Sequence, residues 1–356
     1  MKDTKILIIN NGLAGGGIER ASVSLANYFA EQGHNVTILA LYQSEHFFSL
    51  HKSIELIEPD FSRKNISQYA YAFKMILFAR KKFKKYKPDT ILAFSEWTNP
   101  YMVLANLGLS YPLYLTDRMN PLAKLPLASE ILKKTLYKKA SGIIAQSAFA
   151  KDILQKKTNS NNIKVINNPV NAIVKIQCEP KKRIVTVGRL SPEKGHRFLI
   201  EAFARLKNDS WDLSIVGDGI EMKNLKKLVA KLAIEKRVIF HGHLKDFRQQ
   251  LSEAQIFVLP SLKEGFPNAL LEAMSVPLAC ISTDFFEGKN EIIDNGNNGL
   301  IVKPGNAYEL ASAMEKLISD VDLRQKLSEN AYKVREDFNF GKIAKQYLDF
   351  ILAHHV

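Results

Sequence analysis

Short apolar runs alternate with helical segments along the whole chain, and this alternation most constrains the fold. The apolar runs in the first half are residues 6–9, 35–41, 90–94, 113–115 and 142–146. Strands that alternate with helices are joined by crossover connections, and such connections produce a parallel sheet with helices on both faces. The first half therefore predicts a doubly wound α/β domain.

The alternation lapses at residues 168–182, a polar stretch that we expect to be a linker, and then restarts. Strands are expected in the second half at 183–188, 211–217, 238–241, 256–259 and 278–282, and the last forty or so residues are helical. A chain of 356 residues is also long for one compact core. We therefore expect two doubly wound α/β domains in tandem, with a cleft between them.

An arginine and a lysine come directly after the first strand of the second half. The segment is Gly188-Arg-Leu-Ser-Pro-Glu-Lys-Gly195. Gly188 allows a tight turn, so that Arg189 and Lys194 can project above the sheet edge. A guanidinium and an ammonium group there can neutralise a diphosphate without a metal. Single cations on loops are usually solvated, but the position of these two after a strand favours a binding role.

Two glutamates, Glu264 and Glu272, lie in a segment that begins at the end of an expected strand and turns through Gly265 and Pro267 into a helix. Ligands of α/β sheets bind beyond the carboxyl ends of the strands, where a carboxylate can accept hydrogen bonds from sugar hydroxyls. Eight residues correspond to about two helical turns, which would place both carboxylates on one side. The alternative is a pair of solvated glutamates, and the flanking motifs favour the site.

A glycine-rich loop, residues 11–20, follows the first strand and opens a helix. Glycines at such a place let the backbone approach a ligand and leave helix N–H groups facing an anion. The loop does not match the dinucleotide-binding fingerprint, and no Lys-Ser/Thr pair follows to make a P-loop. A flexible turn is the alternative, and the loop is weak evidence by itself.

Together these segments resemble the large family of retaining nucleotide-sugar glycosyltransferases with the two-domain GT-B fold, often called glycosyltransferase group 1 or family 4. The resemblance covers essentially the whole chain. It rests on Gly-Gly-Gly-Ile-Glu-Arg (15–20), Gly-Arg-Leu-Ser-Pro-Glu-Lys-Gly (188–195), Val-Gly-Asp-Gly (216–219), Glu-Gly-Phe-Pro-Asn-Ala-Leu-Leu-Glu-Ala (264–273) and Asn-Gly-Leu-Ile-Val (298–302).

The resemblance implies the GT-B fold, with an N-terminal Rossmann-like, acceptor-side domain over residues 1–170. A C-terminal Rossmann-like domain that binds the nucleotide-sugar is expected over residues 171–340. A C-terminal helix at about 341–356 is expected to pack back on the first domain.

The resemblance also implies roles on the donor side. Arg189 and Lys194 would hold the nucleotide diphosphate and stabilise charge on the leaving group, and Glu264 would contact the donor sugar. Glu272 would bind the ribose hydroxyls. The other donor-binding residues implied are Gly16, Gly17, Gly188, Gly265, Phe266, Pro267, Asn268 and Ala269.

The chain departs from the family pattern in one place. Many relatives carry a histidine in the loop after the fourth or fifth N-terminal strand, near the sugar. The corresponding stretch here is 116–121, where Asp117 or Arg118 occupies that position. Together with Glu19 these are the expected acceptor-side or sugar-side residues. Which of them replaces the histidine is left open.

The function that the resemblance implies is transfer of a hexose or N-acetylhexosamine, with retention, from a UDP-sugar to a lipid-linked glycan acceptor in surface polysaccharide or glycan assembly. The alternatives are a GDP-sugar donor, a soluble acceptor, and a non-catalytic nucleotide- or glycan-binding module. The last is disfavoured because both cations and both glutamates are present. No cofactor and no metal are expected, because the nucleotide-sugar is a substrate and no Asp-x-Asp pair follows a strand end.

Positive charge is concentrated in the first half. The net charge is +14, and residues 1–170 hold 23 lysines and arginines against 12 aspartates and glutamates. The densest run is 73–87, and a second contains Lys133, Lys134, Lys138 and Lys139. The lysines of the first run alternate with an apolar stripe at helical spacing: Phe73, Ile76, Leu77 and Phe83.

This pattern is typical of an interfacial amphipathic helix, although a solvated helix face is the alternative. It predicts an anionic membrane surface as a partner. Nucleic acid is not expected, because no helix-turn-helix, RNA-binding aromatic signature or zinc spacing is present.

The cysteine content and the absence of long apolar stretches bear on location. Only Cys178 and Cys280 occur, as expected for a reducing compartment. No run approaches the roughly 18 apolar residues of a membrane span, and the N-terminus does not resemble a signal peptide. We expect a cytoplasmic protein, peripheral at the inner face of the cell membrane.

Overall fold

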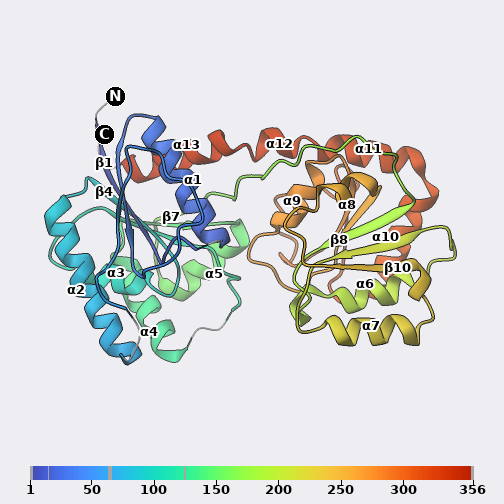
Figure 1. Ribbon diagram of the computed structural model, residues 1–356, viewed down its shortest axis with the longest axis horizontal. Helices are drawn as coiled ribbons and strands as arrows, with labels where there is room; N and C mark the ends of the chain where they lie inside the picture. Colours follow the sequence, from blue (N-terminus) through green and yellow to red (C-terminus); the bar gives the residue numbers. More distant parts are fainter. Residues whose placement is uncertain (1–2, 15, 63–65, 124–125, 354–356) are drawn as a thin grey trace. The chain divides into compact units, whose positions relative to one another are not determined.

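The computed structural model describes residues 3–14, 16–62, 66–123 and 126–353. The chain divides into two compact units: unit 1 is Met1–Asn167 with Gly341–Val356, and unit 2 is Asn168–Phe340. Each unit contains a parallel sheet whose strands alternate with helices along the chain (Figure 1). The predicted fold class, two doubly wound α/β domains, is confirmed.

The described part of unit 1 has a seven-stranded parallel sheet in the order β3-β2-β1-β4-β5-β6-β7. Its strands are β1 (Lys5–Asn10), β2 (Asn35–Ala40), β3 (Glu55–Ile57), β4 (Thr90–Phe94), β5 (Leu113–Asp117), β6 (Gly142–Ala145) and β7 (Ile163–Val165). The central strand β1 pairs with β2 and β4, so that Ile8 stands opposite Ile38 and Leu92. Apart from their first residues β1 and β2 are buried, as is all of β4, because both faces of the sheet are covered by helices.

The helices of unit 1 are α1 (Gly17–Glu31), α2 (Gln68–Tyr86), α3 (Asn99–Asn106), α4 (Leu127–Leu136), α5 (Ala148–Thr158) and α13 (Phe340–Leu352), with a 3-10 turn η1 at Tyr137–Lys139. Alternate strand residues such as Leu7 and Ile9 share one core with Met75 of α2 and Met102 of α3.

Helix α13 belongs to unit 1 although it follows unit 2 in the sequence. Its Phe350 ring packs edge-on against Tyr114 of β5, with the ring centroids 5.1 Å apart. Gly142 of β6 makes room for that ring, since an added Cβ would lie 2.7 Å from Phe350 Cζ. The three residues 354–356 of the helix expected at about 341–356 lie outside the described residues.

Helix α2 carries the basic run, and its apolar residues divide between two faces. Tyr71, Met75, Ala79 and Phe83 recur every four residues and are buried, whereas Phe73 is 61% exposed. The prediction that Phe83 belongs to a lipid-facing stripe is wrong, because the four-residue spacing turns it into the core. Among the helices of the described residues, none is long and apolar enough to cross a bilayer.

The described part of unit 2 has a six-stranded parallel sheet in the order β10-β9-β8-β11-β12-β13. Its strands are β8 (Arg183–Val187), β9 (Asp212–Val216), β10 (Val238–Gly242), β11 (Ile256–Leu259), β12 (Ala279–Thr283) and β13 (Leu300–Val302). Its helices are α6 (His196–Phe203), α7 (Met222–Lys231), α8 (Arg248–Glu253), α9 (Asn268–Met274), α10 (Ala307–Ser319), α11 (Val321–Ala331) and α12 (Val334–Asp337), with 3-10 turns η2 (Pro192–Lys194) and η3 (Glu235–Arg237).

Candidate active site

The loop between β8 and α6 lies close against the end of β11, and the closest approach is at a glycine. Gly195 has φ +66°, and an added Cβ would lie 2.1 Å from the carbonyl oxygen of Pro260. The backbone amide of Leu262 donates to the carbonyl of Glu193 at 2.8 Å. The two loops that carry the predicted cations and glutamates are therefore joined through their backbones.

Lys194 and Glu264 form the centre of this arrangement. The Lys194 ammonium donates to both carboxylate oxygens, at 2.7 Å to Oε1 and 2.8 Å to Oε2. The Ser261 hydroxyl donates to Oε1 at 2.7 Å. Glu264 is only 8% exposed, so its carboxylate is a buried and well-satisfied acceptor. An ammonium has three donors, which leaves Lys194 able to bind a phosphate oxygen while it still contacts Glu264.

Arg189 differs from Lys194 in being exposed. Its guanidinium has no ion-pair partner in the part of the chain that the structure describes, although its charge lowers the pKa of Glu193 after the larger effect of the Ser191 hydrogen bond. The preceding Gly188 lies under the loop after β9, because an added Cβ on Gly217 (φ +142°) would be 1.9 Å from the Gly188 carbonyl oxygen. The Arg189 side chain can therefore bind an anionic ligand, and the backbone that carries it is held by the packing of the loop after β9 on Gly188.

The predicted donor-binding residues after β11 occupy the turn into α9. Gly265 and Ala269 are half-buried, Phe266 and Pro267 are buried, and Asn268 is exposed. The amide of Asn268 donates to the Phe266 carbonyl at 3.0 Å, so this amide is used within the turn.

Glu272 lies on α9, where Asn171 Nδ2 stands 3.5 Å from its Oε1. The helix begins only at Asn268, four residues after Glu264. The expectation that Glu272 follows Glu264 by two helical turns is therefore wrong. Pro267 and Gly265 delay the start of the helix, and Glu264 belongs to the turn.

In unit 1 the N-terminus of α1 already carries a carboxylate, that of Glu19 in its first turn. Gly16 is the N-cap of α1, and an added Cβ on it would lie 2.1 Å from Glu19 Oε2. Gly17 is exposed with open space around it, and Gly15 lies outside the described residues. A carboxylate at a helix N-terminus is favourable, so a diphosphate bound here would have to displace Glu19.

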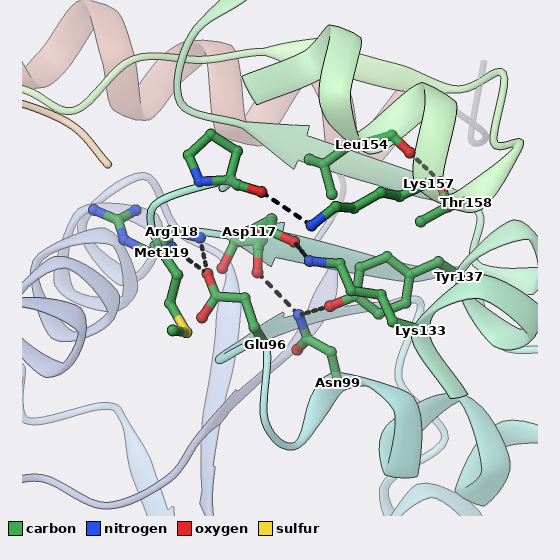
Figure 2. Close-up of polar contacts among 12 residues, drawn as sticks. Glu96, Asn99, Asp117, Arg118, Met119, Lys133, Tyr137, Leu154, Lys157 and Thr158 are labelled. Carbon is green, nitrogen blue, oxygen red and sulfur yellow. Dashed lines mark hydrogen bonds and ion pairs between the residues drawn. The ribbon is translucent and has the colours of Figure 1, made fainter. Parts of the chain in front are cut away.

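Asp117 and Arg118 stand at the carboxyl end of β5, in a buried polar cluster shown in Figure 2. Asp117 forms a buried ion pair with Lys133 of α4. The Arg118 guanidinium donates to the Tyr347 hydroxyl of α13 at 3.2 Å and lies 5.9 Å from the Phe94 ring centroid. Both residues are engaged within unit 1, and an acceptor-side role for either stays a prediction.

The same cluster contains residues that sequence reasoning missed. Glu96 is 1% exposed, and its Oε1 accepts hydrogen bonds from the backbone amides of Arg118 and Met119. Asn99 Nδ2 donates to the Thr116 carbonyl at 2.9 Å and lies 3.4 Å from the Tyr137 hydroxyl. The available signal was the position of Glu96, two residues after the strand 90–94.

The sequence patterns of two glycosyltransferase families together match almost the whole chain. The sequence pattern of the family described as Glycosyltransferase Family 4 matches residues 15–172. That of Glycosyl transferases group 1 matches residues 173–334. The two matches divide the chain within a few residues of the boundary between the units. The chain is a GT-B glycosyltransferase.

Similar proteins match this glycosyltransferase along their whole length. It is 27% identical over 366 residues to an uncharacterized glycosyltransferase of Haemophilus influenzae, covering 98% of this chain and 99% of that one. It is 26% identical over 356 residues, 98% of each chain, to the GalNAc-alpha-(1->4)-GalNAc-alpha-(1->3)-diNAcBac-PP-undecaprenol alpha-1,4-N-acetyl-D-galactosaminyltransferase of Campylobacter jejuni.

Solved structures share the fold of the glycosyltransferase. That of Anabaena Alr3699/HepE in complex with UDP has a TM-score of 0.84 at 20% identity, over 98% of this chain and 100% of that one. The lipopolysaccharide outer core galactosyltransferase WaaB, in its apo form, has a TM-score of 0.80 at 23% identity, over 98% and 99%.

The site residues of the glycosyltransferase fall into two sets. Gly16, Gly17, Glu19, Asp117 and Arg118 belong to unit 1, and the other predicted residues belong to unit 2. Within the described ranges, no group of three or more His, Cys, Asp or Glu side chains is arranged to hold a metal ion.

Proposed function

We propose that this glycosyltransferase transfers a hexose or N-acetylhexosamine from a UDP-sugar to a lipid-linked glycan acceptor, in surface polysaccharide or glycan assembly. The observation that carries the donor half is the joined pair of loops in unit 2. They carry an exposed Arg189 and a Lys194 that is held by Glu264. A diphosphate needs such cations, and a sugar hydroxyl needs such a carboxylate.

The proposed mechanism uses these groups in sequence. Arg189 and Lys194 bind the diphosphate and stabilise the charge that develops on it as the bond to the sugar breaks. Glu264 keeps Lys194 in place and accepts a hydrogen bond from the donor sugar, while Glu272 binds the ribose. The acceptor hydroxyl attacks the face from which the nucleoside diphosphate departs and passes its proton to the departing phosphate oxygen, so that the anomeric configuration is retained.

We propose UDP as the nucleotide because relatives point to it: the Anabaena structure was solved with UDP. Thermal-shift measurements with UDP, GDP and ADP test the choice, since a ligand at one hundred times its Kd stabilises by about 2.7 kcal/mol. A shift with GDP alone would instead support the GDP-sugar alternative. No shift with any of the three would favour a module that binds no nucleotide.

Catalysis is tested with a Lys194→Ala variant. Loss of one charge contact in the transition state should lower kcat/KM by about 3 kcal/mol, roughly a hundredfold. Lys263→Ala is the matched control, because Lys263 is an exposed lysine on the same loop as Glu264. If Lys194→Ala and Lys263→Ala were equally active, the diphosphate would have to bind at another place. We also propose that no metal is needed, so EDTA should leave transfer unchanged.

The acceptor half of the proposal rests on unit 1 and on the relatives. The Campylobacter jejuni relative carries undecaprenol in its name. In unit 1 a pocket of about 300 Å³ is lined by residues of α2, of α3, of the start of α4 and of the loops after β2 and β4, and most of them are aromatic or uncharged polar residues. Its lining includes Tyr69, Trp97, Gln68 and Thr98. Aromatic faces with amide and hydroxyl groups suit a neutral sugar ring.

A transfer assay with an undecaprenyl-diphosphate-linked N-acetylhexosaminide and UDP-N-acetylhexosamines tests this acceptor. Trp97→Ala should raise the KM for the acceptor without changing the affinity for UDP. Phe73→Ala is the control, because Phe73 is an exposed aromatic residue of α2 that does not line the pocket. Transfer to a water-soluble oligosaccharide with equal efficiency would favour the soluble-acceptor alternative.

We further propose peripheral attachment to an anionic membrane through α2. Lys81, Lys84 and Lys85 are exposed on its C-terminal half, and the helix contains no acidic residue. Each basic residue near an anionic surface contributes about 1 kcal/mol. Binding to vesicles of phosphatidylglycerol should fall at high salt and on changing these lysines to glutamate. Changing Lys223, Lys226 and Lys227 of α7, which are also exposed, should have no comparable effect.

A further inference from the structure

The chain leaves β4 through a strained residue that turns two neighbouring side chains in different directions. Ser95 has φ +117°, which a residue with a side chain adopts at a cost of order 1–3 kcal/mol. Its hydroxyl accepts a hydrogen bond from Asn11 Nδ2 at 3.0 Å, which helps to hold it. After this turn Glu96 is 1% exposed, whereas Trp97 is 47% exposed.

The Glu96 side chain joins two loops. Its Oε1 accepts from the amide of Met119 at 2.6 Å and from the amide of Arg118, both in the loop after β5. Figure 2 shows both backbone nitrogens directed at this oxygen. The loop that carries Trp97 and the loop that carries Arg118 are therefore fixed to each other by one buried carboxyl group.

The surroundings decide the charge of that carboxyl group. The charged and titratable groups around it are Asp117 at the end of β5, Arg118 after it, Lys133 on α4 and Tyr137 in η1. Lys133 is already paired with Asp117. Burial, and next the charge of Asp117, raise the pKa of Glu96 to about 8. This shift favours the protonated, neutral carboxyl group, while Oε1 accepts the two backbone N–H groups.

We infer that Glu96 is a positioning residue of the acceptor side, whose Oε1 holds the Arg118–Met119 backbone against the loop that carries Trp97. The inference rests on the proposed function in one respect, namely that unit 1 receives the acceptor. It assigns Glu96 no contact with substrate. A neutral carbonyl-type acceptor is sufficient for this task, so a glutamine should perform it and an alanine should not.

Hydrogen–deuterium exchange tests the clamp without any substrate. In Glu96→Ala the amides of residues 118 and 119 lose their buried acceptor, and exchange in a peptide covering 116–122 should accelerate tenfold or more. Glu96→Gln should keep most of the protection. Equal exchange in the wild type and the alanine variant would overturn the inference, whatever the transferase activity.

Kinetics then test the effect on the acceptor, with the donor and acceptor pair that the transfer assay identifies. Glu96→Ala should raise the acceptor KM about tenfold and change kcat less, while its Kd for UDP stays at the wild-type value. Glu96→Gln should restore the acceptor KM to within about twofold, from pH 6 to pH 9. A glutamine variant as impaired as the alanine variant would show that the carboxyl acts by another route. An unchanged Kd for UDP in all three proteins shows that unit 2 is intact.

Discussion

Replacing Glu96 by glutamine should change the stability of unit 1 in a manner that depends on pH. Burial raises the pKa of Glu96 from 4.5 to about 8. Between pH 4.5 and pH 8, Glu96 therefore keeps a proton in the folded state that it has released in the unfolded state. Stability therefore falls as the pH rises from 4.5 to 8 and levels off above 8. Glutamine has the same shape and does not titrate, so it removes this loss.

The width of this pH interval gives the order of magnitude of the change in stability. Each pH unit corresponds to about 1.4 kcal/mol, so the wild type loses at most about 5 kcal/mol between pH 4.5 and pH 8 relative to Glu96→Gln. At pH 5 the variant should be equal or slightly less stable, because its buried amide hydrogens replace one hydroxyl. At pH 8.5 it should be the more stable protein. For a unit of this size the midpoint of thermal unfolding should rise by about 5 °C or more.

Calorimetry of both proteins at several pH values between 5 and 9 measures the difference. The control is Glu31→Gln, which removes an exposed carboxylate from α1 of the same unit. A constant difference between wild type and Glu96→Gln across this range would refute the reasoning. It would mean that the buried carboxyl is ionised throughout, with Lys133 shared between two carboxylates.

Three further predictions concern the other contacts. Gly195→Ala should lower the free energy of unfolding of unit 2 by about 2 kcal/mol or more and should weaken UDP binding. Gly242 has a similar φ of +68° but open space around it, so Gly242→Ala should lower the free energy of unfolding by only about 1 kcal/mol. Lys133→Met should lower the free energy of unfolding by about 3–5 kcal/mol by leaving Asp117 buried and unpaired, and adding Asp117→Asn should recover much of it. Glu264→Gln should reduce turnover more than UDP affinity, because the proposed contact of this carboxylate is with the donor sugar, which UDP lacks, and calorimetric titration showing a large loss of UDP affinity would contradict this.

The fold was predictable because its central strands are continuous apolar runs between helical segments. Runs such as 6–9 and 90–94 are read directly as buried parallel strands. The strands β3, β7 and β13 have three residues each, too few to establish a period, and they were not predicted. Helix α2 shows a second limit, since an apolar residue among lysines, Phe83, belongs to the core only because of its spacing from Met75 and Ala79.

The candidate site was predictable only in part. Arg189 and Lys194 follow a strand end, and that position identified them. The contact between Lys194 and Glu264 joins residues seventy positions apart, so no local pattern contains it. Lys133 was grouped with Lys134, Lys138 and Lys139 as a basic run, but it is buried and paired with a long-range partner, Asp117. Glu96 was missed because its direction depends on a positive φ at Ser95, which a serine seldom adopts.

Because helix α13 is the last element of the chain to be made, we expect the two units to complete their folding at different times during synthesis on the ribosome. Unit 2 is one continuous segment, Asn168–Phe340, and can fold as soon as it leaves the exit tunnel. Unit 1 is made first but must wait for Phe350, which covers Tyr114 and fills the space beside Gly142. Until then its nascent sheet exposes an apolar face, which chaperones would be expected to protect. A fragment ending at residue 167 would keep that face exposed, and joining 341–353 directly to it would supply the missing cover.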